Sequence, residues 1–189
     1  ENKRNAIFLD RDGVINKEVD NLRNILDFEL LPGVVDAIKK INESNYLAII
    51  VTNQPVISKG FCTIKDLENI HNKLEFELSK KGAYIDRIFY CPHHPDKGFE
   101  GEIESLKINC DCRKPKTGMI KDAIKKFNIN IKESFIIGDR TVDIKTGKNI
   151  KLKTVLVKTG YAGNDNKYKS VPDFIFKDLN SAINNILKK

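Results

Sequence analysis

The sequence predicts an α/β fold, a doubly wound parallel sheet with helices on both faces, and two observations carry this prediction. Short apolar runs rich in β-branched residues, such as residues 47–51, alternate along the chain with segments of helical apolar spacing, such as residues 64–78. Such runs are typical of strands buried on both faces of a parallel sheet. Strands that alternate with helices pair in parallel through right-handed crossovers. A chain of 189 residues can form one substantial core, so we expect a single domain over residues 1–189.

Each element follows from local pattern. Buried strands are expected at residues 6–9, 47–51, 85–90, 135–137 and 154–157, with a short edge strand at 174–176. Helices are expected at residues 33–44, 63–81, 117–127, 142–148 and 178–187. Pro32 suits a first helical turn, Thr63 with Asp66 forms a capping pair, and Asp178 is a good N-cap. Residues 16–31 lack periodicity, so we expect a long loop there.

Composition and charge exclude several classes of protein. Apolar residues make up 40% and charged residues 31%, which is typical of a globular protein, and no apolar run approaches the roughly 20 residues that span a bilayer. The first residues lead into a strand without a signal-like apolar segment, so we expect a cytoplasmic protein without a membrane partner. The net charge is +7, but the lysines are dispersed, so we expect no nucleic-acid partner. A positive field would attract an anionic substrate.

Polar side chains follow the predicted strands at the point where each strand ends. Asp10 and Asp12 come after the first strand, Thr52-Asn53-Gln54 ends the second, and Asp139 follows the fourth. The carboxyl ends of parallel strands meet at one edge, where open α/β sheets bind ligands. Close carboxylates repel each other unless a cation lies between them or their pKa values separate, and oxygen ligands suit magnesium.

Such a set could transfer a phosphoryl group. A carboxylate can attack phosphorus, and a second carboxylate can protonate the departing alkoxide and then activate water. A hydroxyl, an amide and a cation such as Lys114 would stabilise the phosphate oxygens. Taken singly, each motif is also an ordinary turn or a solvated charge. Their joint occurrence in this order favours the functional interpretation.

A second cluster joins cysteine and histidine. Cys91, Cys110 and Cys112 lie within one stretch that also holds His93 and His94, a complete Cys3His set for structural zinc that would tie together the loop at about residues 91–112. The spacing leaves the choice between the two histidines open. Cys62 stands apart, and we expect a partly buried thiol.

These motifs together resemble the haloacid dehalogenase (HAD) phosphatase superfamily. Asp10-Arg11-Asp12-Gly13 matches its first motif, Thr52 the second, Lys114 the third, and Gly138-Asp139-x-x-x-Asp143 the fourth. The resemblance implies that Asp10 is the nucleophile, that Asp12 is the general acid and base, and that Thr52 and Lys114 stabilise the phosphoryl group. It implies a magnesium ion held by the Asp10 side chain, the Asp12 carbonyl and Asp139.

Within this superfamily, Asp-Arg-Asp-Gly, Thr-Asn-Gln, Cys-Pro-His-His and Cys-x-Cys-Arg-Lys-Pro resemble the D-glycero-D-manno-heptose 1,7-bisphosphate phosphatases, close to the histidinol-phosphate phosphatases. The resemblance implies His93 as the zinc ligand, no large cap domain, a monomer, and removal of the C7 phosphate in the synthesis of nucleotide-activated heptose for surface polysaccharide. The implied partner is a small phosphorylated sugar. Its binding residues are expected to be Glu18, Asn21, Asn53, Gln54, Arg113 and Arg140.

Two segments depart from the family pattern. Residues 55–60 read Pro-Val-Ile-Ser-Lys-Gly where a small residue, glycine and Arg-Gly are common, and residues 17–23 lack a frequent Gly-Tyr. Both would face the leaving group, so the sugar and its anomer stay open. Histidinol phosphate and a DNA 3′-phosphate are alternative substrates, and a zinc-stapled binding module is the alternative without catalysis.

Overall fold

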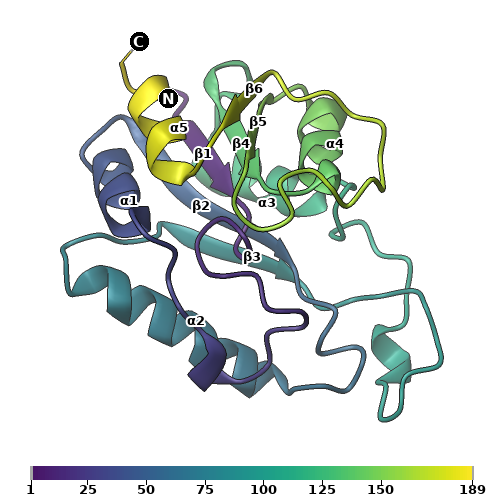
Figure 1. Cartoon of the computed structure of the whole chain (residues 1–189). Helices are drawn as coiled ribbons and strands as arrows, with labels where there is room; N and C mark the ends of the chain where they lie inside the picture. Colours follow the sequence, from purple (N-terminus) through teal and green to yellow (C-terminus); the bar gives the residue numbers. More distant parts are fainter. Residues whose placement is uncertain (1, 189) are drawn as a thin grey trace.

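The computed structural model describes residues 2–188 and has the predicted architecture (Figure 1). Within these residues, six parallel strands form one sheet in the order β3-β2-β1-β4-β5-β6. The strands are β1 (Asn5–Leu9), β2 (Tyr46–Asn53), β3 (Arg87–Cys91), β4 (Phe135–Gly138), β5 (Lys153–Val157) and β6 (Phe174–Phe176). The helices are α1 (Val34–Asn42), α2 (Ile64–Ser79), α3 (Gly118–Phe127), α4 (Thr141–Ile150) and α5 (Leu179–Ile186), with short 3₁₀ turns at Ile25–Asp27, Glu104–Leu106 and Ile131–Glu133.

The sheet separates two apolar layers, because alternate residues of each strand point to opposite faces. In β1, Ile7 and Leu9 pack with α1, α2 and α5, whereas Ala6 and Phe8 pack with α3. Figure 1 shows the sheet running between these two groups of helices. None of the helices in the described part of the chain combines the length and apolar character that crossing a bilayer requires.

Element boundaries differ from expectation where side chains or turns replace regular pairing. The strand expected at 85–90 lies at Arg87–Cys91, because the Asp86 carboxylate accepts a hydrogen bond from the Ala48 amide at 2.8 Å before the ladder begins. Helix α2 ends at Ser79 rather than 81, where Gly82 adopts a left-handed conformation and the Ala83 amide donates to the Leu78 carbonyl. The capping box of Thr63 with Asp66 and the Asp178 N-cap form as predicted, and the loop expected over residues 16–31 contains the 3₁₀ turn Ile25–Asp27.

The strand order indicates where on the sheet a ligand site can form. β1 pairs with both β2 and β4, so the connections run in opposite directions on its two sides. A ligand crevice forms at such a reversal, at the carboxyl ends of the strands. Asp10 follows β1 and Asp139 follows β4, so the two carboxylates stand at this point.

Candidate active site

A tight turn after β1 aims the first carboxylates. The Asp10 amide extends the pairing with β4 by donating to the Ile137 carbonyl at 3.0 Å, and the Ile15 amide then closes the turn by donating to the Arg11 carbonyl at 2.8 Å. Gly13 has a φ of 81°, and a Cβ atom there would lie 2.3 Å from Asp139 Oδ2. Only glycine therefore allows the turn to pack against the carboxylate that follows β4.

Three buried carboxylates form an acidic group at this edge of the sheet. One oxygen from each of Asp10, Asp139 and Asp143 lies within 4.8 Å of the others. The Tyr161 amide donates to Asp139 Oδ2 at 2.7 Å, but Asp139 Oδ1 is buried without a hydrogen-bond partner among residues 2–188. Burial and the neighbouring carboxylates raise the pKa of Asp139 to about 8 and that of Asp143 to about 7. An unpartnered buried oxygen beside another carboxylate fits a divalent cation with oxygen ligands.

Lys114 neutralises part of this charge. Its Nζ lies 3.0 Å from Asp10 Oδ1 and 2.6 Å from Asp143 Oδ1, and its side chain is 2% exposed. Burial alone would lower the pKa of Lys114, but the two carboxylates raise it above its ordinary value. The Asn53 side chain fixes the Lys114 backbone through two hydrogen bonds. Asn53 Nδ2 donates to the Lys114 carbonyl at 3.1 Å, and Asn53 Oδ1 accepts from the Lys114 backbone amide at 2.9 Å. The Asn53 side chain therefore positions Lys114.

Asp12 occupies a different environment from Asp10. Its side chain lies outside the acidic group and accepts hydrogen bonds from Arg11, from Asn16 Nδ2 at 2.9 Å and from Gln54 Nε2 at 2.9 Å. Burial would raise the pKa of Asp12, but the Arg11 charge and these hydrogen bonds lower it on balance. Gln54 Nε2 also donates to Thr52 Oγ1 at 2.9 Å, so one amide links the hydroxyl to the carboxylate.

A cavity of about 410 Å³ opens above these groups. The sequence-predicted residues that line it are Asp10, Asp12, Glu18, Asn21, Thr52, Asn53, Gln54, Arg113, Lys114 and Arg140. The Arg140 guanidinium lies 3.7 Å above the Tyr161 ring and donates to Glu18 Oε2 at 3.0 Å, so it joins the loop after β1 to the loop after β5. Burial and the nearby Asp12 carboxylate raise the pKa of Glu18.

Sequence reasoning missed several other residues in the cavity wall. These are His94, Tyr161, Asp165 and Lys167, among others. Tyr161 and its neighbours follow β5, so the same rule of strand ends that predicted Asp139 would have found them. Asp165 holds its loop in place by accepting from the Thr141 amide at 2.8 Å. Lys59 belongs to the segment 55–60 that was expected to face the leaving group, and it lines the cavity as well.

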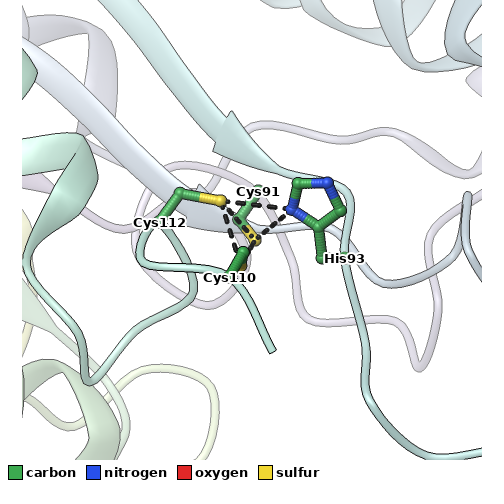
Figure 2. Close-up of side chains that lie close together, drawn as sticks. All are labelled: Cys91, His93, Cys110 and Cys112. Carbon is green, nitrogen blue, oxygen red and sulfur yellow. Dashed lines mark hydrogen bonds between the residues drawn. The ribbon is translucent and has the colours of Figure 1, made fainter. Parts of the chain in front are cut away.

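The cysteine and histidine side chains converge as predicted (Figure 2). Sγ atoms of Cys91, Cys110 and Cys112 lie 3.0–3.5 Å apart, and His93 Nδ1 lies 3.3 Å from Cys112 Sγ and 3.7 Å from Cys91 Sγ. These four atoms have the composition and approximate spacing of a tetrahedral zinc site. The structure separates the two histidines, because His93 belongs to the cluster whereas His94 lines the cavity. Cys62 lies apart as a half-buried free thiol.

His71 is buried on α2. It takes no part in either cluster of possible metal ligands found among residues 2–188.

Comparisons with known proteins agree with this geometry. The HAD-hydrolase-like family profile matches residues 111–182. The D-glycero-alpha-D-manno-heptose-1,7-bisphosphate 7-phosphatase of Photorhabdus laumondii is 43% identical over 161 residues, which cover 85% of this chain and 86% of that protein. The D-glycero-beta-D-manno-heptose-1,7-bisphosphate 7-phosphatase of the same organism is 36% identical over 186 residues, which cover 97% of each chain.

A solved structure extends the comparison to three dimensions. The D,D-heptose 1,7-bisphosphate phosphatase from B. bronchiseptica, complexed with magnesium and phosphate, superposes with a TM-score of 0.85 at 28% identity and covers 97% of this chain and 98% of that one. The chain therefore belongs to the D-glycero-D-manno-heptose 1,7-bisphosphate 7-phosphatase family of HAD-like hydrolases.

Proposed function

We propose that this protein is a magnesium-dependent phosphatase that removes the C7 phosphate from D-glycero-D-manno-heptose 1,7-bisphosphate. The observation that carries the proposal is the pairing of Asp10 with Lys114 beside the Asp139 carboxylate, at the base of a cavity of about 410 Å³. A cavity of this size accepts a phosphorylated sugar. The names of the relatives supply the sugar, and the reaction would serve the synthesis of nucleotide-activated heptose for surface polysaccharide.

The first step transfers the phosphoryl group to the protein. An oxygen of the Asp10 carboxylate attacks phosphorus, the bond between phosphorus and the C7 oxygen breaks, and an aspartyl-phosphate forms. Asp12 gives a proton to the departing C7 alkoxide, so the sugar leaves as an alcohol. The Lys114 ammonium and the Thr52 hydroxyl stabilise the charge on the phosphoryl oxygens.

The second step returns the enzyme to its starting state. Asp12, now ionised, takes a proton from water as the water oxygen attacks phosphorus, and the Asp10 carboxylate leaves as inorganic phosphate forms. The lowered pKa of Asp12 in the free site favours the ionised carboxylate, which is the form that accepts a proton. For the first step, the negative charge of a bound phosphate beside Asp12 would raise its pKa and favour the protonated acid.

Two metals have separate places in this proposal. The Asp10 side chain, the Asp12 carbonyl and Asp139 would hold magnesium, which supplies positive charge to neutralise the phosphoryl oxygens. The unpartnered Asp139 Oδ1 supports this ligand set. Cys91, His93, Cys110 and Cys112 would hold zinc, and four protein ligands leave no position for a reacting water, so that metal is structural.

The rest of the cavity would recognise the sugar and its second phosphate. We propose that Arg113 and Arg140 supply positive charge, and that Glu18, Asn21 and Gln54 contact hydroxyl groups. Asn53 contributes by holding Lys114. We further propose that the protein acts in the cytoplasm as a monomer, as the family resemblance implies, and gel filtration tests the second point.

A panel of phosphate esters tests the proposed function. We expect phosphate release from heptose 1,7-bisphosphate in at least one anomer, with phosphorus NMR showing loss of the C7 signal and retention of the C1 signal. Histidinol phosphate and a 3′-phosphorylated oligonucleotide should react at least a hundredfold more slowly. Histidinol phosphate has no second phosphate for the cavity arginines, and an oligonucleotide is much larger than a cavity of about 410 Å³. If the protein hydrolysed either of these esters faster than the heptose bisphosphate, that ester would replace the heptose bisphosphate as the proposed substrate.

The nucleophile has its own test. Asp10→Asn should abolish phosphate release, because an amide cannot attack phosphorus, while the zinc content and the thermal midpoint stay close to those of the original protein. Retained turnover would refute the role of Asp10.

A further inference from the structure

A buried arginine, Arg11, separates the two catalytic aspartates in the sequence. Arg11 is fully buried and does not line the cavity, so it is not placed to touch a substrate. Its Nε and Nη2 donate to Asp12 Oδ1 at 3.1 and 2.9 Å, and Nη2 also donates to Asp12 Oδ2 at 3.0 Å. A guanidinium that contacts both oxygens fixes the plane of a carboxylate.

His71 holds the other end of this guanidinium. Its Nε2 lies 3.1 Å from Arg11 Nη1, although the two residues are 60 positions apart and His71 belongs to α2. Arginine nitrogens only donate, so Nε2 must accept the hydrogen bond, and the ring must be neutral. Burial and the Arg11 charge lower the pKa of His71 to about 3, which agrees with a neutral ring. The ring also packs near Tyr90 of β3, with 5.9 Å between ring centroids.

We propose that His71 is a positioning residue for proton transfer: by accepting a hydrogen bond from Arg11 it holds the guanidinium that orients the Asp12 carboxylate. The proposal rests on the proposed function, in which Asp12 moves the proton. A histidine that only filled space between α2 and the sheet would not need a nitrogen at this position. Proton transfer requires the carboxylate within hydrogen-bond reach of the leaving oxygen, so a small rotation of Asp12 slows it.

Two variants of similar size separate positioning from packing. His71→Gln retains an acceptor at nearly the distance of Nε2, whereas His71→Leu fills the space without one. For each variant, kcat/KM is measured with heptose 1,7-bisphosphate and with p-nitrophenyl phosphate. The value of kcat/KM reports steps up to departure of the leaving group, and p-nitrophenolate leaves without a proton. General acid catalysis contributes about 10²–10⁴-fold, so partial loss of its geometry should be measurable.

We expect His71→Leu to lower kcat/KM for the sugar phosphate at least about tenfold and to leave the value for the aryl phosphate within about threefold. His71→Gln should stay within about threefold for both substrates. Equal losses on the two substrates, equal losses in the two variants, or no loss in His71→Leu would each overturn the proposal. Thermal midpoints and zinc content verify folding. If the unsubstituted protein releases no phosphate from the heptose bisphosphate, the proposed function fails instead, and the variants are compared on the best alkyl phosphate of the panel.

Discussion

Removing the Lys114 ammonium tests how the site balances its buried charge. Nζ lies between Asp10 and Asp143, and neither the lysine nor the Asp143 side chain is open to water. In Lys114→Met the volume is nearly kept, but the two carboxylates lose their cation. Breaking a buried pair in this way costs about 3–5 kcal/mol of unfolding free energy. For a domain of this size, that corresponds to a fall in thermal midpoint of roughly 6–20 °C.

The stability loss in Lys114→Met should depend on pH in a direction that the pKa of Asp143 determines. The folded pKa of Asp143 is already raised to about 7, and loss of the lysine raises it further. In this pH range the Asp143 carboxyl binds fewer protons in the unfolded chain than in the folded one. The free energy of unfolding therefore falls as the pH rises. The deficit of Lys114→Met should therefore be larger at pH 8 than at pH 5.

The assay is thermal and denaturant unfolding in magnesium-free buffer at both pH values. Lys148→Met is the matched control, because the Lys148 side chain pairs with Asp173 at a site where both side chains are 39% exposed. Such exposed pairs contribute about 0–1 kcal/mol. This prediction would be refuted if Lys114→Met lost no more unfolding free energy than the control, or if its loss became smaller from pH 5 to pH 8.

Two further predictions concern the metal sites. Cys110→Ser should lower zinc content in metal analysis and reduce the thermal midpoint, whereas Cys62→Ser, which lies outside the cluster, should change neither. Gly160→Ala places a methyl carbon 2.2 Å from Asp139 Oδ2, so the magnesium concentration for half-maximal activity should rise at least about tenfold. Gly82→Ala has the same left-handed backbone strain but no atom within 4 Å, so it should lose about 1–2 kcal/mol of stability without altering the magnesium response.

Much of the fold could be predicted because local and global signals agree. The strand Phe135–Gly138 is an apolar run in the sequence and lies buried in the centre of the sheet. The capping pair of Thr63 and Asp66 forms as expected. The strand-end rule predicted Asp10 and Asp139 at one edge because strands that alternate with helices run parallel, so their carboxyl ends lie on the same side of the sheet.

The remaining features depend on contacts between distant segments. His93 and His94 are adjacent, so their sequence distance from the cysteines does not decide which of them is a ligand. The path of the chain after β3 brings His93 to the cysteines and His94 to the cavity. The contact between His71 and Arg11 joins a helix to a turn 60 residues earlier, and no local pattern records it. No sequence motif predicts that Asn53 holds the Lys114 backbone or that Arg140 pairs with Glu18.

The cysteine cluster and the phosphate site are parts of one arrangement. The Arg113 amide donates to Cys110 Sγ at 3.3 Å, and its guanidinium donates to the His93 carbonyl at 3.2 Å. The next residue is Lys114, whose backbone is held by Asn53 at the end of β2. The loop that carries both cations is therefore fixed on one side by the cluster and on the other by the sheet. Because phosphoryl transfer depends on groups positioned before the substrate arrives, a metal at the cluster would support catalysis through geometry alone, without contact with the reacting atoms.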